Sequence, residues 1–313
     1  MIRHSAFIDV KKHLKGGLHC HTTRSDGRGE PDDVIRLHVE NGYDFLALTD
    51  HRIYNHKNFA PDVNITIIPG MEMDRSLPRG GIHCHHIVSI GPEKDKGNGF
   101  EQAQRFPTGK VETVEETQEM LDMLHENGNM TIYCHPEWSG VLLEEFEPLK
   151  GNFAMEIWNS GCAIEDGVDT NALYWDDMLD KGHRIWGVAT DDGHQMYQHC
   201  KGWVMVNSEN NVSAILDALK EGKFYSSCGP EIYDFYMEDG VAHVKCSEVV
   251  EIQFVHKRAP YRLVKAAEGE TITEGSINAY TGSTDYIRAV VKDAQGRRAW
   301  TNPLYFKDAD SVR

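Results

Sequence analysis

Hydrophobic and polar positions follow a helical period and then a strand-like run early in the chain. Apolar side chains recur at Val34, Ile35 and Leu37, after a start rich in acidic residues that also holds a proline. Asn41-Gly42 is typical of a helix end. Residues 45–48 are continuously apolar and lead into the polar residues 49–51. This pattern predicts an amphipathic helix followed by a buried strand.

The same pattern occurs twice more. A predicted helix over 114–125 precedes an apolar run at 130–134, and a predicted helix over 172–180 precedes one at 184–189. Further strands are predicted at 65–68, 87–90, 153–158 and 203–206. Alternating strands and helices favour a parallel sheet, and the polar residues gather where the strands end. The pattern is that of a (β/α) barrel.

The pattern changes after a last amphipathic helix over 211–221. From residue 229 onward we find short alternating runs separated by turn residues, at 232–236, 241–246, 249–255, 286–291 and 303–306. We therefore predict an α/β domain over 1–228 and a small all-β, sandwich-like domain over 229–313. Residues 91–110 form a long polar segment inside the first domain, which we expect to be a lid or substrate loop.

Composition narrows the class of protein. The 313 residues are 40% hydrophobic and carry a formal net charge of −17, which disfavours a large nucleic-acid surface or an anionic membrane as partner. No apolar run reaches the length of a membrane span, and the first residues lack the apolar core of a signal peptide. The seven cysteines are scattered without a CxxC pair. We expect a cytoplasmic protein with reduced thiols.

Imidazole and carboxylate side chains follow several of the predicted strands. His19 and His21 are two residues apart, as are Asp192 and His194, so each pair shares one face of an extended chain. Alone, each pair is a weak signal. The full set is too rich for a single ion, and its mixed nitrogen and oxygen donors suit manganese, zinc or iron.

The order of these motifs resembles the PHP family, named for its polymerase and histidinol phosphatase members. The resemblance extends from about residue 17 to 228 and rests on seven motifs. These are His19-x-His21, Asp26 in S-D-G, Asp50-His51 in T-D-H, Gly70-x-Glu72, His86-Ile87-Val88, Cys134-His135-Pro136 and Asp192-Gly193-His194.

The resemblance implies a distorted (β/α)7 barrel that holds three divalent metal ions at its strand ends. His19, His21, Glu72 and Asp192 would hold one ion. Glu72 would bridge to a second, completed by His86 and His135, and Asp26, His51 and His194 would hold the third. The family hydrolyses phosphate esters with a metal-activated bridging water, so no side-chain nucleophile is expected.

Some assignments stay open in the sequence. In the run 82–86 we favour His86 as the ligand, with His83 as the alternative and His85 on the face of His83. Arg52, like Arg24, Arg75 and Arg79, is a candidate for a phosphate contact or for ordinary solvation. Asp50 and Asp191 are candidates to orient neighbouring ligands. No metal role is expected for the other histidines: His4, His13, His38, His56, His125, His183, His199, His243 and His256.

These observations predict a metal-dependent phosphatase or phosphodiesterase acting on a small molecule or a short nucleotide. One alternative is a metal-dependent hydrolase of C–N or carboxylic ester bonds. Another is a non-catalytic metal-binding module. Residues 229–313 carry no ligand cluster in their sequence, so packing or dimerisation is their simplest role, and homo-oligomerisation is left open.

Overall fold

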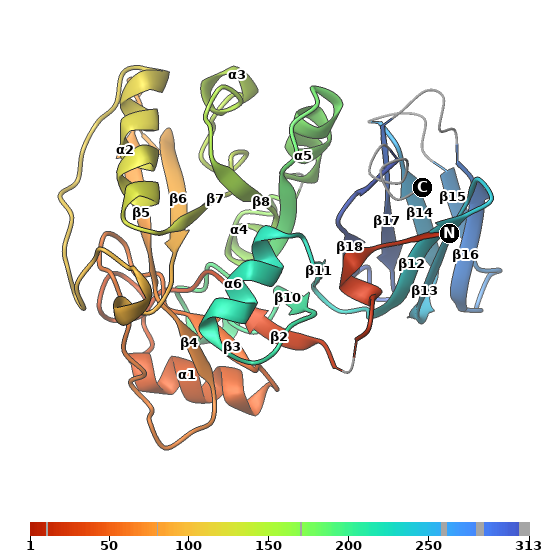
Figure 1. Ribbon diagram of the computed structural model, residues 1–313, viewed down its shortest axis with the longest axis horizontal. Coiled ribbons are helices and arrows are strands. Elements are labelled where there is room, and N and C mark those ends of the chain that lie inside the picture. The colour runs from red at the N-terminus through yellow and green to blue at the C-terminus, as the bar shows by residue number, and fades with distance from the viewer. Residues whose placement is uncertain (11, 80, 170, 258–261, 280–284, 307–313) are drawn as a thin grey trace.

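The computed structural model describes residues 1–10, 12–79, 81–169, 171–257, 262–279 and 285–306. Figure 1 shows an α/β part beside a part built from strands, with the N-terminus against the latter. Within the described ranges, no helix is both long enough and apolar enough to cross a membrane.

Two mixed sheets form the α/β part. In the first, β2 (Leu14–Gly17), β3 (Phe45–Ala47) and β4 (Thr66–Ile68) run parallel, while β10 (Trp203–Val206) and β11 (Phe224–Ser227) continue it antiparallel. The second has the order β5 to β9, and its strands are Gly70–Ser76, Cys84–Ile90, Met130–Tyr133, Asn152–Asn159 and Trp186–Thr190.

The second sheet is less regular than the expected alternation of parallel strands and helices. Strands β5 and β6 pair antiparallel, as do β6 and β7, whereas β7, β8 and β9 are parallel. The described residues between β5 and β6 form no helix. An antiparallel pair follows, because a parallel one needs a crossover of a dozen or more residues.

Four longer helices lie near their predicted positions: α1 (Pro31–Glu40), α2 (Val114–Glu126), α5 (Asn171–Asp180) and α6 (Val212–Lys220). Thr113 and Asn211 cap α2 and α6, because each side chain accepts a hydrogen bond from a backbone N–H of the first turn. The short helices α3 (Leu143–Phe146) and α4 (Ser160–Glu165) were not predicted. Single 3-10 turns occur at Ser5–Phe7 (η1), Lys94–Lys96 (η2) and Met196–Gln198 (η3).

One apolar core lies between the two sheets. It includes Leu18, Val88, Ile132, Val188 and Val204, and the apolar face of α6 packs against it. None of the seven cysteines, all of which lie in the described residues, forms a disulfide there.

The strand-built part consists of two facing sheets. One contains β1 (Ile2–Arg3), β12 (Ile232–Glu238), β13 (Val241–Val249) and β16 (Ile272–Asn278). The other contains β14, β15, β17 and β18, with β19 beside β17: Glu251–Val255, Arg262–Lys265, Tyr286–Lys292, Arg298–Thr301 and Leu304–Tyr305. Their inner faces enclose a second apolar core around Phe235, Val244 and Phe254. From 232 to 306, every regular element in the described residues is a strand.

The two parts share a sheet. Strand β18 pairs with β11, so the path of strands continues from β15 through β18 into β11, β10 and β2. A buried ion pair adds a second link, since Arg288 Nη2 on β17 lies 2.6 Å from Asp176 Oδ1 on α5. The predicted boundary at 228 therefore falls within one continuous sheet.

Candidate metal centre

The His19-x-His21 segment lies just beyond the end of β2. Backbone hydrogen bonds join it to the segment after β9: the His21 N–H donates to Gly193 O (3.1 Å) and the Asp192 N–H donates to His19 O (3.0 Å). The Nε2 atoms of His19 and His21 are 3.2 Å apart. The motifs His19-x-His21 and Asp192-x-His194 are thus held side by side, and the rings of His19 and His21 point toward each other.

Glu72 is the centre of the histidine cluster. It is fully buried and follows β4, as the sequence predicted, although it lies within a further strand, β5. Its Oε1 lies 2.7 Å from His86 Nδ1 and 3.8 Å from His135 Nε2. Its Oε2 lies 3.0 to 3.4 Å from one ring nitrogen of each of three histidines: His19, His21 and His51.

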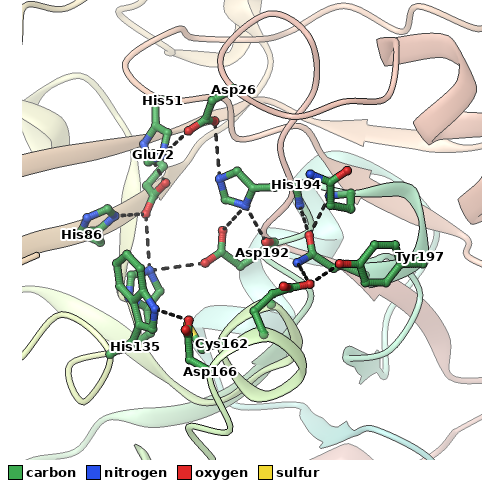
Figure 2. Close-up of a pocket in the computed structure, with 15 residues that line it drawn as sticks. Asp26, His51, Glu72, His86, His135, Cys162, Asp166, Asp192, His194 and Tyr197 are labelled. Carbon is green, nitrogen blue, oxygen red and sulfur yellow. Dashed lines mark hydrogen bonds and ion pairs between the residues drawn. The ribbon is translucent and has the colours of Figure 1, made fainter.

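Two aspartates complete the group (Figure 2). Asp192 Oδ1 lies 3.0 Å from His21 Nε2, and its Oδ2 lies 3.5 Å from His135 Nε2. Asp26 lies between His194 Nε2, 3.4 Å from its Oδ1, and His51 Nε2, 3.6 Å from its Oδ2. The structure therefore brings all nine predicted ligand residues together at one place.

The donor atoms form three overlapping groups. These are His19, His21, Glu72 and Asp192; His51, Glu72 and His86; and His21, Asp26, His51 and His194. The first group is the one that the family resemblance implied. The other two differ from the implied sets: His51 belongs to both of them, and His135, which was expected beside His86, belongs to none of the three groups.

The charges of the cluster fit bound cations. Burial alone would raise the pKa of Glu72, but His51, His19 and His86 hold it well below its usual range. Burial alone would lower the pKa of His51, yet Glu72 and Asp74 raise it to about 11. Glu72 Oε2 and His51 Nδ1 are buried and have no hydrogen-bond partner in the described structure. Crowded imidazoles around one carboxylate require positive charge, and divalent ions supply it without placing protons on adjacent rings.

Glu156 supports the cluster and was not singled out in the sequence. From β8, its Oε1 accepts hydrogen bonds from His19 Nδ1 (2.6 Å) and Thr190 Oγ1 (2.6 Å). Its Oε2 accepts from the His135 N–H (3.2 Å) and from Asn159 Nδ2 (2.8 Å). Glu156 thereby fixes the His19 ring with Nε2 toward Glu72. The one signal in the sequence was a charged residue inside the apolar run 153–158.

The sequence made Asp50 a candidate to orient its neighbour His51, but the Asp50 carboxylate binds other groups. It is buried, and its Oδ1 accepts hydrogen bonds from the Thr22 N–H (2.8 Å) and Ser25 Oγ (3.0 Å). Its Oδ2 accepts from Asn55 Nδ2 (2.9 Å). Asp50 therefore anchors the loop that carries Asp26.

The run 82–86 divides as its alternation suggested. His86 faces Glu72, whereas His83 Nε2 lies 3.1 Å from Glu145 Oε2, beside Arg79. His85 Nδ1 is 2.6 Å from the Tyr133 hydroxyl. The structure thus places His86 in the cluster and His83 in a separate ion-pair group.

Arg52 is adjacent to the cluster but is already paired. Its guanidinium contacts the carboxylate of Asp74, which in turn lies 3.4 Å from His51 Nδ1. Arg52 does not line the pocket above the cluster.

A pocket of about 390 Å³ opens above the cluster. Trp138 and Tyr197 contribute aromatic surface, and each donates a hydrogen bond to an acid beside α4: Trp138 Nε1 to Asp166 Oδ2 (2.7 Å) and the Tyr197 hydroxyl to Glu165. Among the described residues that line it there is no Lys or Arg, and none comes from the 91–110 segment. The lining comprises Asp26, His51, Glu72, His86, His135, Trp138, Gly161, Cys162, Glu165, Asp166, Asp192, His194, Gln195, Tyr197 and Gln198.

Comparisons with known proteins give limited matches. No family model matches the sequence. A 5'-3' exoribonuclease from Haemophilus influenzae is 34% identical over 84 residues, which span 26% of this chain and 30% of that enzyme. Less than a third of the relative is therefore represented.

Solved structures give more extensive but weaker similarity. One is a two-domain protein from Bacteroides vulgatus containing a predicted PHP-like metal-dependent phosphoesterase, with 15% identity, a TM-score of 0.47, and coverage of 95% of this chain and 97% of that one. Another is an amidohydrolase from Chromobacterium violaceum with bound sulfate, with 16% identity, a TM-score of 0.41, and coverage of 58% and 88%. At these values neither structure indicates an activity for this chain, whose chemistry must come from the nine side chains beneath the pocket.

Proposed function

We propose that the chain is a metal-dependent phosphoesterase of the PHP type, hydrolysing the phosphate ester of a small molecule. One observation carries the proposal: the buried carboxylate of Glu72 is shared by five histidines on the floor of an open pocket. The order of motifs from His19 to His194 supports the same family. In this proposal the two mixed sheets are a distorted (β/α)7 barrel, and residues 229–313 are a sandwich-like second domain.

The ligand residues would hold three divalent ions, of manganese, zinc or iron. Such ions lower the pKa of bound water, orient a phosphoryl group and offset its charge. Glu72 would be a ligand shared by adjacent ions, and Glu156 holds the His19 ring with Nε2 toward Glu72. Cys162 lines the pocket, and burial raises the pKa of its thiol, which disfavours a thiolate nucleophile.

The pocket mouth favours particular substrates. The acidic side chains of Glu165 and Asp166 line it, and no Lys or Arg does so among the described residues. A second phosphate on the substrate would therefore meet negative charge. Trp138 and Tyr197 offer flat apolar surface. We infer a substrate with one phosphate and a neutral or cationic remainder that is flat or rich in hydroxyl groups.

Hydrolysis of a panel of mono- and diesters, after loading with Mn²⁺, Zn²⁺ or Fe²⁺, tests the proposal, with released phosphate measured for monoesters and the released alcohol for diesters. Carboxylic esters and amides belong in the same panel. Glu72→Gln should lower turnover about 100-fold or more, since the ions depend on this carboxylate and contribute several kcal/mol to catalysis. Glu145→Gln is the matched control, because its carboxylate pairs with His83 outside the cluster.

Two results would contradict the proposal. Turnover confined to amides or carboxylic esters would assign the site to a different hydrolase class. No turnover on any compound, with metal demonstrably bound, would favour a metal-binding module.

A further inference from the structure

A second group of metal-binding side chains lies apart from the pocket. It consists of His38 on α1, Asp191 at the end of β9, and His199 after η3. One donor atom of each lies within 4.8 Å of those of the other two. All three are buried, with His38 0%, Asp191 2% and His199 2% exposed, and none of them lines the pocket.

The hydrogen bond of His38 defines its tautomer. His38 Nδ1 lies 2.7 Å from the Val34 carbonyl oxygen, which only accepts, so Nδ1 carries the hydrogen. In the neutral ring, Nε2 then presents a lone pair. This atom lies 3.4 Å from Asp191 Oδ2 and makes no hydrogen bond. Two acceptors therefore face each other, and a cation between them is required, either a proton or a metal ion.

Asp191 is held as a metal-binding carboxylate would be. Backbone N–H groups of Cys200 (2.7 Å), Lys201 (2.7 Å) and Gly202 (2.8 Å) donate to its two oxygens. These donors stabilise the ionised form and fix its direction toward His38. Hydrogen bonding of this kind typically supports the ligands of a metal site.

His199 decides between a proton and a metal ion. Neither of its ring nitrogens has a hydrogen-bond partner in the described structure. Its ring lies 5.4 Å from that of His38. It also packs closely against Gly193, since a Cβ added to that glycine would lie 2.5 Å from His199 Nδ1. A proton shared by His38 and Asp191 would leave both nitrogens of His199 unsatisfied in the interior, which is costly. A metal ion would satisfy one nitrogen from each ring.

A further orphaned group lies beside these residues. The Tyr43 hydroxyl is buried without a hydrogen-bond partner, and the Tyr43 ring meets His38 edge-on with 4.7 Å between centroids. Several polar atoms without partners thus gather around one carboxylate, as expected where an ion belongs.

We propose that His38 Nε2, Asp191 and one ring nitrogen of His199 bind a structural divalent cation. Two imidazoles and one carboxylate match zinc best, with a fourth position left for a water or the Tyr43 hydroxyl. The ion would tie α1 to the turn after β9, directly behind Asp192 and Gly193. The sequence had suggested no metal role for either histidine, and their buried nitrogens revise that expectation.

Access from the pocket separates this ion from those of the cluster. Seven of the nine cluster ligands, all except His19 and His21, line the open pocket, so a chelator can approach the ions that they would hold. An ion among His38, Asp191 and His199 leaves only when the surrounding structure opens. Zinc incorporated during folding should therefore survive a chelator treatment that strips the pocket. This proposal does not depend on the activity of the pocket.

The full chain, produced in zinc-supplemented medium and dialysed against EDTA, tests the site by elemental mass spectrometry. Wild type should retain about one zinc per chain, and Glu72→Gln should retain the same amount. His38→Gln and His199→Gln should retain none, whereas His4→Gln, which changes a buried histidine elsewhere, should match wild type. Two results would overturn the proposal. One is the loss of all zinc from wild type, and the other is that His38→Gln and His199→Gln retain as much zinc as wild type.

A second measurement covers variants that fail to fold. Crystals of the wild-type chain, dialysed in the same way, should show an anomalous peak at the zinc edge between His38, Asp191 and His199. A map without this peak would reject the site regardless of how the variants behave.

Discussion

Individual backbone conformations help to place the ligands. His135 and Asp192 have φ angles of 25° and 48°, in the left-handed region that non-glycine residues rarely adopt. Each lies where a strand ends, at β7 and β9, and each contacts the Glu72 cluster. Strain of this kind persists where the surrounding structure holds a residue for function. The motifs C-H-P and D-x-H predict the residue types but not this geometry.

Glu156 should act as a positioning residue. Glu156→Gln keeps the size of the side chain but weakens its charge-assisted hydrogen bond to His19. We expect metal affinity to fall about 10- to 100-fold, as for other residues that orient a metal-binding histidine. Activity should recover at saturating metal, which separates positioning from catalysis. Metal titrations followed by activity and by calorimetry measure both, and unchanged affinity would refute the role.

His4 should make stability depend on pH. Burial, followed by the charge of His13, lowers the pKa of His4 to about 3. The unfolded chain, with a pKa near 6.5, therefore binds the proton more readily than the folded chain. Stability from this group is complete above about pH 6.5. It falls by about 1.4 kcal/mol per pH unit as the pH drops toward the folded pKa.

Denaturant titrations of wild type and His4→Asn between pH 7 and pH 5 measure this dependence. Asn retains an acceptor for the Ala6 N–H, which His4 Nδ1 accepts in the wild type. The variant should lose less stability than wild type as the pH falls. Parallel curves would exclude His4 as the titrating group.

At the scale of elements, the hydrophobic periodicity of the sequence predicted those helices and strands whose apolar side chains form the core. Helices α1, α2, α5 and α6 bury apolar faces, and side chains cap α2 and α6, so their positions followed from the pattern. Strand β5 was missed because its residues at 72, 74 and 75 are charged, one of them facing the ligand cluster. Strand β2 was obscured by Gly16, where a Cβ would lie 2.0 Å from the Phe45 ring. Strands β15 and β16 expose much of their length, so their apolar signal is weak.

The residues that each element brings to the centre were easier to predict. The motifs specify the chemical type of each of these residues, and all nine predicted ligand residues lie in one cluster. The partners of those residues were not predictable, because Glu156, Asp74 and Glu145 contact histidines far away in the sequence. Only the folded sheets bring such pairs together.

Trp138, which follows β7, lines the pocket together with α4 and η3 and should set substrate preference. Trp138→Ala should raise KM for esters with an aromatic leaving group about 2- to 10-fold, since an aromatic contact contributes about 0.5 to 1.5 kcal/mol. Esters with a small aliphatic group should change little. Tyr233→Ala, an exposed tyrosine on β12, is the control. An equal rise in KM for both substrate classes would contradict a selective wall.

At the scale of the whole molecule, the shared sheet and the Arg288–Asp176 pair join the two parts. The pair is almost fully buried, and Arg288 Nη1 has no hydrogen-bond partner in the described structure. Burial raises the pKa of Asp176, although the charge of Arg288 opposes the shift. The pair therefore bears a large desolvation cost, and removing one partner should be worse than removing both.

Arg288→Met alone should lower the free energy of unfolding by about 3 to 5 kcal/mol, because it leaves a buried carboxylate unpaired. The double variant Asp176→Leu with Arg288→Met should regain most of that loss. Urea unfolding measures both, and a double variant as unstable as Arg288→Met would show that the charges themselves are needed.

The pairing of β1 with β12 sets an order of assembly on the ribosome. Residues 2 and 3 are made early, but their partners at 236 and 237 emerge only after the whole α/β part has been synthesised. Strand β2 pairs early with β3 but gains its second partner only when β10 is made. Strand β1 therefore waits for β12, and His19 and His21 reach their final places only when the segment after β9 arrives, because backbone hydrogen bonds join them to it. The proposed cations would therefore meet a complete set of ligands only after Asp192 and His194 have been synthesised.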